Sequence, residues 1–345
     1  MPEPGRVALD ATYSIGRNLS GVGVYSREIL FGLARAHPDA RFQFCYRPHR
    51  FLRSFRDSLP GNCRRFLLQE PAVPRRAEIF HGLNQRLPTS RPRRAVTTFH
   101  DLFVLTGDYS TPEFRRRFTE QARRAAAESD RIITVSESTA RQVEELLGVE
   151  RSRLRVVHHG VRTPDPSGSP RENIVLHVGA LQKRKNVARL VAAFAALPKD
   201  WRLVLAGSAG FGAEEILRAI EGSQARERIA TLGYVGSKEL AGWYSRAMIL
   251  AFPSLDEGFG IPILEAMAAG VPVVTSNRSA PAEVAGEAAF LVNPESVEEL
   301  AYALTRLAAD TPLREELIRM GLARAREFSW ARAVEKTWDV YRELV

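Results

Sequence analysis

The segment SLDEGFGIPILEAMAAG, residues 254–270, has residue types and spacing suited to binding an anion. It follows an apolar run, typical of a buried strand, that ends at Phe252. Pro262 suits the first turn of a helix, and Gly270 suits the position just past a helix end. The helix is therefore expected to start near residues 260–261 and to direct its unpaired N–H groups into the loop. Such a helix start is a ready site for a phosphate.

Two carboxylates flank this predicted anion site. Glu257 lies in the loop, and Glu265 lies about one turn inside the helix. Both are poorly placed to bind the anion itself but well placed to accept hydrogen bonds from sugar hydroxyls beside it. Glu265 taken alone is also typical of an acid favoured by the helix dipole. Gly258 and Gly260 permit close approach of a ligand to the backbone, which favours the sugar-binding interpretation.

The segment HVGALQKRKN, residues 177–186, supplies cations at the end of another predicted strand. Lys183, Arg184 and Lys185 form a turn, and Asn186 is expected to cap the following helix. A solvated turn is the ordinary interpretation of such a cluster. A diphosphate, however, needs cationic donors, and Lys or Arg supply them without a metal.

Two segments of the first half also carry candidate residues. In SGVGVY, residues 20–25, Gly21 and Gly23 separate the first predicted strand from the first predicted helix, without matching the GxGxxG fingerprint. In TTFHD, residues 97–101, a strand ends on His100. A single histidine is more often structural than catalytic, but the carboxyl end of a parallel strand is where ligands bind.

Short apolar strands alternate with helix-period segments along the chain, which predicts α/β architecture with parallel sheets covered on both faces. We expect two doubly wound, Rossmann-like domains across a cleft, 1–167 and 168–329, joined by the Pro- and Gly-rich stretch 163–170. The predicted strands are residues 6–10, 41–46, 94–99, 131–135, 154–158, 174–178, 202–206, 230–232, 248–252 and 272–275.

The composition and the absence of several motifs exclude a number of protein classes. The 345 residues are 45% hydrophobic and 26% charged, typical of a globular protein, and no apolar run reaches the roughly 18–20 residues of a membrane span. The first twenty residues do not resemble a secretory signal, so a cytoplasmic protein is expected. Two cysteines, Cys45 and Cys63, cannot build a disulfide framework or a zinc site. The chain has no Asp-x-Asp pair, no GxxxxGK[ST] loop, no HExxH, no GxSxG and no CxxC.

The charge is uneven along the chain. Residues 1–167 carry 28 Arg and no Lys against 18 acids, a net of +10, whereas residues 168–345 carry 21 bases and 22 acids, a net of −1. The first half therefore favours phosphates, anionic lipids or nucleic acid, although the preference for Arg over Lys is also typical of genome composition. Residues 50–59, RFLRSFRDSL, interleave Arg with apolar side chains. They suit a helix on an anionic membrane or an amphipathic helix against the core.

The chain resembles the retaining glycosyltransferases of group 1, family 4, which have the GT-B fold. The resemblance runs nearly end to end through GVGVYSREIL, TTFHDL, DRIITVSESTARQV, RVVHHGV, VGALQKRKN, LGYVGSKELAGWYSRA and EGFGIPILEAMAAGVPVV. The spacing of Glu257 and Glu265 is its most diagnostic feature. DATYSIG, GVGVY and FHDL are similar to the branch rich in bacterial mannosyltransferases of surface-polysaccharide assembly.

The resemblance implies a nucleotide-sugar donor site in the second domain. Glu265 would hold the ribose hydroxyls, and Lys185 with Arg184 would neutralise the diphosphate. Tyr234 and Val235 would lie beside the base. The donor-binding residues implied are Gly21, Gly23, Arg184, Lys185, Tyr234, Val235, Glu257, Gly258, Phe259, Gly260 and Glu265.

The resemblance also implies which residues act on the transferred sugar. Glu257 and the backbone of residues 258–260 would grip the sugar and the diphosphate. Gly21 and Gly23 would approach both groups, and His100 would contact the sugar near the reacting carbon. His100, Glu257 and Lys185 are thus the expected catalytic residues, with no metal and no cofactor. The last helix, within 330–345, would cross back to the first domain.

The sequence departs from the family at one position, because many members carry Arg where Ala180 stands here. Mannose from GDP-mannose is expected from the branch alone, with a glycan or lipid-linked acceptor and contact with an anionic membrane. A sugar-nucleotide epimerase, a phosphorylase and a non-catalytic nucleotide-sugar sensor are the alternatives on this fold. A nucleic-acid binder, suggested by the basic charge, lacks a helix-turn-helix, zinc-finger or RRM signature.

Overall fold

The computed structural model describes residues 3–16, 18–70, 74, 76–162 and 170–345. The chain divides into two compact units, described separately below. Unit 1 comprises residues 1–106, 112–160 and 329–345, and unit 2 comprises residues 107–111 and 161–328. The predicted boundary near residue 168 and all of the predicted linker except Pro170 lie outside the described residues.

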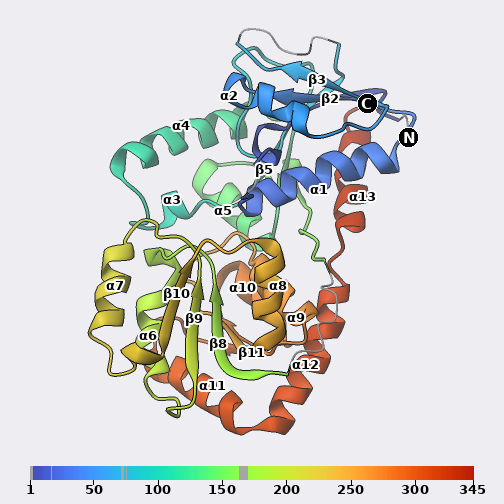
Figure 1. The fold of residues 1–345 in the computed structure, drawn as a ribbon. Helices are drawn as coiled ribbons and strands as arrows, with labels where there is room; N and C mark the ends of the chain where they lie inside the picture. The colour runs from blue at the N-terminus through green and yellow to red at the C-terminus, as the bar shows by residue number, and fades with distance from the viewer. Residues whose placement is uncertain (1–2, 17, 71–73, 75, 163–169) are drawn as a thin grey trace. The chain divides into compact units, whose positions relative to one another are not determined.

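Unit 1 is built on a seven-stranded parallel sheet of order β3-β2-β1-β4-β5-β6-β7 (Figure 1). Its strand order reverses direction between β1 and β4, the switch point at which ligands bind in open parallel sheets. Val, Ile, Leu and Phe dominate the central strands because helices cover both faces. The strands are β1 (Arg6–Asp10), β2 (Arg41–Tyr46), β3 (Cys63–Leu67), β4 (Ile79–Gly82), β5 (Ala95–Phe99), β6 (Arg131–Thr134) and β7 (Leu154–Val156).

The C-terminal helix α13 (Trp330–Arg342) belongs to unit 1 and packs against α1 (Gly21–Ala36), as Figure 1 also shows. Trp338 and Tyr341 on α13 are fully buried in the same apolar cluster as Tyr25 on α1. The other helical segments of unit 1 are η1 (Thr12–Ser14), α2 (Pro48–Phe51), η2 (Leu52–Arg56), α3 (Phe103–Thr106), α4 (Pro112–Glu128), α5 (Glu137–Leu147) and η3 (Arg151–Arg153).

Unit 2 contains a six-stranded parallel sheet of order β10-β9-β8-β11-β12-β13 (Figure 1). Here the order reverses between β8 and β11, so the loops after these two strands meet at the sheet's switch point. The strands are β8 (Glu172–Val178), β9 (Arg202–Ala206), β10 (Ile229–Gly233), β11 (Ala247–Phe252), β12 (Val273–Ser276) and β13 (Phe290–Val292).

Helices of unit 2 bury their apolar sides against this sheet, with Leu190, Leu304 and Leu307 fully buried. The helical segments are η4 (Lys183–Lys185), α6 (Val187–Phe194), α7 (Ala213–Glu221), η5 (Arg226–Arg228), α8 (Ser237–Arg246), α9 (Ile261–Ala268), α10 (Ser279–Ala285), α11 (Val297–Ala309) and α12 (Thr311–Arg326). The two doubly wound α/β units confirm the predicted fold class. Among the described residues, we find no helix with the length and apolar character needed to cross a membrane.

Candidate functional site

The loop between β11 and α9 carries Glu257 and ends where the sequence predicted the helix start. Helix α9 begins at Ile261, with Pro262 in its first turn. Gly260 is the N-cap residue at a φ of 110°. L side chains rarely adopt this backbone conformation, so a glycine is required there. The free N–H groups of the first turn of α9 thus follow directly after the Glu257 loop.

The loops after β8 and β11 are tied together by backbone and side-chain hydrogen bonds. Leu255 N donates to Arg184 O at 2.8 Å, and the side-chain amide of Asn186 donates to Pro253 O at 3.0 Å. Asn186 is the N-cap of α6, as predicted, but its side chain caps no helical N–H. Its amide instead holds the cationic turn against the Glu257 loop.

Glu257, Arg184 and Lys185 form a buried ion triad between these loops. The guanidinium of Arg184 lies 2.8 Å from Glu257 Oε2, and the ammonium of Lys185 pairs with Glu257 Oε1. Glu257 is only 7% exposed and Lys185 only 8%. Arg184 Nη1 also donates to Asp256 O at 3.1 Å, which fixes the guanidinium against the loop.

The charge of the triad follows from the pKa of its carboxyl group. Burial raises the pKa of Glu257, but attraction to Arg184 and Lys185 outweighs burial and lowers that pKa to about 2. The carboxylate is therefore ionised at neutral pH, and the triad retains one net positive charge. A carboxylate has about four lone-pair directions, so two cations leave room for a sugar hydroxyl to donate to it.

Aromatic side chains at the ends of the same strands enclose Lys185. Its ammonium lies 4.7 Å from the ring centroid of Phe252, the last residue of β11. His177 on β8 stacks on that ring at 6.1 Å, and its Nδ1 is 3.0 Å from Ala251 O. Since a carbonyl oxygen only accepts, Nδ1 carries the proton, and burial lowers the pKa of His177 to about 4. His177 is therefore a neutral neighbour of Lys185.

Glu265 is held by a different partner from Glu257. The hydroxyl of Tyr244, on α8, donates to Glu265 Oε2 at 2.8 Å. Burial raises the pKa of Glu265, and the Tyr244 hydrogen bond opposes that effect. The remaining carboxylate oxygen Oε1 is the one suited to vicinal hydroxyls of a ribose.

A strained residue on a neighbouring element braces the Glu257 loop. Ser279, the first residue of α10, has a φ of 60°, which is unusual for a residue other than glycine. Its hydroxyl is 3.1 Å from both Asp256 Oδ1 and Glu257 O. The strain is thus coupled to two hydrogen bonds that fix the residue before the triad carboxylate and the backbone of Glu257 itself.

Tyr234 and Val235 follow β10, as predicted. Tyr234 is 47% exposed and Val235 is half-buried. Phe259, in contrast, is buried and meets Phe328 edge-on at 5.9 Å, so its side chain is part of the packing under the loop.

In unit 1 the two predicted phosphate-loop glycines lie inside a helix. Helix α1 begins at Gly21, whereas the sequence placed both glycines before the helix, and this prediction was wrong. The Ser20 hydroxyl accepts a hydrogen bond from Gly23 N at 3.3 Å and so supplies the N-cap. A Cβ atom at Gly23 would lie 2.9 Å from Tyr13 O. Close packing against the backbone of Tyr13 therefore explains why position 23 is a glycine.

His100 follows β5 and is almost completely buried. Its Nε2 is 2.9 Å from Leu83 O, so Nε2 carries the proton and Nδ1 is left as an acceptor. Burial lowers the pKa of His100 to about 4. The ring meets Tyr25 edge-on at 4.7 Å and stacks with His159 at 5.5 Å. His100 is thus a rigid neutral imidazole.

Comparison with known proteins decides the family. A model described as "Glycosyltransferase Family 4" matches residues 19–165, and one described as "Glycosyl transferases group 1" matches residues 163–324. The chain is 30% identical to O-antigen chain mannosyltransferase B of Escherichia coli, over 97% of this chain and 99% of that protein. This chain belongs to the group 1, family 4 glycosyltransferases.

Other relatives agree with this assignment at lower coverage. The serotype-specific mannosyltransferase WbdA of Escherichia coli is 27% identical over 74% of this chain, which spans about a third (34%) of that protein. Among solved structures, sucrose-phosphate synthase from Thermosynechococcus elongatus has a TM-score of 0.77 at 22% identity, with 99% of each chain covered. Anabaena HepE with UDP-glucose has a TM-score of 0.75 at 18% identity, again with 99% of each covered. Both are similar in fold, which is GT-B.

The structure of this glycosyltransferase joins Glu257, Arg184 and Lys185 in one cluster. Glu265 is instead hydrogen-bonded to Tyr244 on α8. Sequence reasoning missed Tyr244 and Ser279. Tyr244 lies in the quoted motif LAGWYSRA, but its contact depends on where α8 packs. Ser279 carries no sequence signal, since its backbone strain appears only in three dimensions. The described ranges contain no group of three or more His, Cys, Asp or Glu suited to a metal ion.

Proposed function

We propose that this glycosyltransferase moves mannose from GDP-mannose, with retention of configuration, to a hydroxyl of a lipid-linked glycan in surface-polysaccharide assembly. Similarity to O-antigen chain mannosyltransferase B over almost the whole chain supports mannose and the glycan acceptor. The observation that carries the chemistry is the buried triad of Glu257, Arg184 and Lys185 beside the start of α9.

The triad suits the charge that develops on a leaving diphosphate. Breaking the bond between sugar C1 and the phosphate oxygen builds negative charge on the nucleoside diphosphate. Lys185, Arg184 and the free N–H groups of α9 are fixed in advance, so they stabilise that charge without reorganisation. These cations do the work that a metal ion does in other transferases, which supports metal-independent transfer. Arg184 supplies the guanidinium that Ala180 does not.

In the route proposed here for retention, the acceptor hydroxyl attacks from the face that the diphosphate leaves. The new bond joins C1 to the acceptor oxygen, and the acceptor proton passes to the departing phosphate oxygen. Nucleoside diphosphate and the extended glycan are the products, so atoms and charge balance without an enzyme base. Glu257 then acts as a hydrogen-bond acceptor for hydroxyls of the transferred mannose.

A membrane contact is supported by the segment α2–η2, residues 48–56. Phe51 packs on the core, whereas Leu52 is 81% exposed and Phe55 is 61% exposed. The alternative of an amphipathic helix against the core fits Phe51 but not Leu52 or Phe55. Arg53 and Arg56 are exposed beside them. Exposed apolar side chains among arginines suit insertion into the interface of an anionic bilayer.

A donor panel tests the proposal. Thermal unfolding would be followed with GDP-mannose, UDP-glucose, UDP-GlcNAc and ADP-glucose, each with and without EDTA. Binding stabilises the fold by an amount that grows with the logarithm of the ligand excess over Kd. GDP-mannose should give the largest shift, and EDTA should leave it unchanged. Product from a lipid-linked glycan would then be analysed by NMR for an α-linkage. Shifts limited to another nucleotide sugar would refute mannose as the sugar, and isomerised donor without acceptor would indicate an epimerase.

A further inference from the structure

Unit 1 contains a pocket that is lined by none of the residues expected to bind the donor. It opens at the carboxyl end of β1, next to β4, which is the switch point of this sheet. Its volume is about 180 Å³, below the usual range of about 300–1,000 Å³ for whole small-molecule ligands, so it suits one part of a ligand such as a phosphate group. The lining residues are Thr12, Tyr13, Ile15, Asn18, Leu19, Ser20, His49, Arg50 and Arg86.

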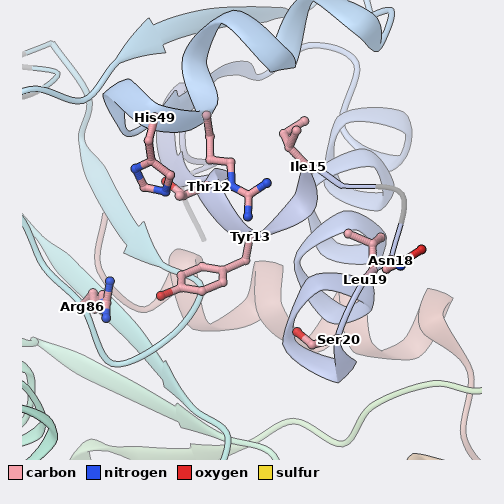
Figure 2. Close-up of a pocket in the computed structure, with 9 residues that line it drawn as sticks. Thr12, Tyr13, Ile15, Asn18, Leu19, Ser20, His49 and Arg86 are labelled. Atoms are coloured by element: carbon pink, nitrogen blue, oxygen red, sulfur yellow. The ribbon is translucent and has the colours of Figure 1, made fainter. Parts of the chain in front are cut away.

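Basic side chains line this pocket, and its lining includes no carboxylate from the residues that the structure describes. Arg50, on α2, is half-buried, and its guanidinium has no hydrogen bond or ion pair with any residue in the described ranges. Arg86 reaches the pocket from the chain after β4, and its guanidinium lies 5.9 Å from the ring centroid of Tyr13. Figure 2 shows the Tyr13 side chain extending toward Arg86. A half-buried guanidinium with no partner among the described residues is available to bind an anion.

Asp10, the acid at the end of β1, is already engaged. Asp10, the last residue of β1, accepts a hydrogen bond from Thr12 N at 3.0 Å and lies 3.8 Å from Arg47 Nε. Its carboxylate therefore holds the turn in place and is paired with a different arginine. The positive charge of Arg50 and Arg86 is not cancelled from within the pocket.

We propose that this pocket binds the phosphate of a phosphorylated acceptor, with Arg50 and Arg86 as the anion-binding residues. Guanidinium groups bind phosphate oxygens in bidentate geometry. The hydroxyls of Thr12, Tyr13 and Ser20 suit the sugar attached to that phosphate, and Ile15 and Leu19 add an apolar wall. Leu52 and Phe55 follow Arg50 closely in the chain and are exposed. A diphosphate that carries a lipid chain therefore suits both features.

This inference rests on the proposed transfer to an acceptor, and calorimetry separates the two. Citronellyl diphosphate and inorganic pyrophosphate would each be titrated into the full chain saturated with GDP, which occupies the donor diphosphate site. The variants are Arg50→Gln and Arg86→Gln. The control is Arg64→Gln, which removes the same charge from an exposed residue of unit 1 outside the pocket. A thermal scan checks that each variant is folded.

We expect both pocket variants to bind citronellyl diphosphate at least tenfold more weakly, and Arg64→Gln to bind it like the wild type. If inorganic pyrophosphate binds with the same dependence on Arg50, the pocket recognises a free anion. If citronellyl diphosphate binds more tightly than pyrophosphate, the pocket recognises a lipid headgroup. Equal affinities in all variants would overturn the pocket assignment. The proposed function can fail separately from this inference. In that case citronellyl diphosphate still binds in calorimetry, but no sugar is transferred from any donor.

Discussion

The ammonium of Lys185 is paired with the carboxylate of Glu257 although one follows β8 and the other follows β11. The pair exists because these strands are neighbours at the reversal of the sheet. A buried lysine and a buried glutamate each satisfy the other's charge, and this contact helps to hold the two loops together. One contact thus sets the positions of the cation and the carboxylate to which we assign the diphosphate and the sugar.

Lys185→Ala should reduce kcat by about 10²–10³-fold, because a fixed charge is removed from the leaving group. The fold should be affected little, since Arg184 still neutralises Glu257. Turnover and the thermal midpoint measure both effects. Lys183→Ala is the matched control, because Lys183 is an exposed lysine of the same turn. Equal turnover in the two variants would exclude the role assigned to Lys185.

Ser279 offers a test of how the Glu257 loop is held. Ser279→Ala keeps the strained backbone and loses both hydrogen bonds, so it should cost about 1–2 kcal/mol of stability. Ser279→Gly loses the same bonds but relieves the positive φ, which returns about 1 kcal/mol. Both variants should lose kcat to a similar extent if the hydroxyl positions Glu257. If Ser279→Gly instead kept both more stability and a higher kcat than Ser279→Ala, the role of Ser279 would be purely structural.

Much of this architecture could be predicted from the sequence, because the central strands of both sheets are apolar runs. Apolar runs such as β8 and β11 are buried on both faces, so composition reveals them. The edge strand β3, CRRFL, and the short strand β4 were missed because neither has such a run. Gly23 looked like a phosphate-loop glycine, but its neighbour is Tyr13 O, a contact that no local pattern encodes.

Tyr244→Phe should weaken nucleotide binding several-fold, because the Tyr244 hydroxyl orients the Glu265 carboxylate. The kcat should change little, because this hydroxyl does not contact the reacting atoms. The Tyr244 hydrogen bond lowers the pKa of Glu265, so its loss should raise that pKa further. Binding of GDP should then fall off at a higher pH than in the wild type as the pH is lowered. Titrations at several pH values measure this shift. Tyr302→Phe, an exposed tyrosine of unit 2, should show no shift.

The stability of the protein should fall as the pH is lowered from 6.5 to 4. Burial lowers the pKa of His81 to about 3 and those of His100 and His177 to about 4. The unfolded chain takes up these protons near pH 6.5 and the folded chain does not, so each histidine costs about 2 kcal/mol at pH 5. Urea unfolding at pH 7.5 and pH 5.5 measures the slope. His177→Gln should reduce it, whereas replacing the exposed His49 with Gln should leave it unchanged.

Exposed apolar side chains on η2 predict how the protein meets a membrane. Leu52→Ser with Phe55→Ser should reduce co-sedimentation with vesicles of phosphatidylglycerol and phosphatidylcholine by at least fivefold at low salt, because both side chains would otherwise enter the interface. The matched control replaces Leu217 and Tyr302, also exposed but in unit 2, with Ser. Salt should weaken binding of the wild type, since the neighbouring arginines contribute through screened charge. Equal binding of both double variants would place the contact elsewhere on the protein, and no sedimentation of the wild type would discard the membrane contact.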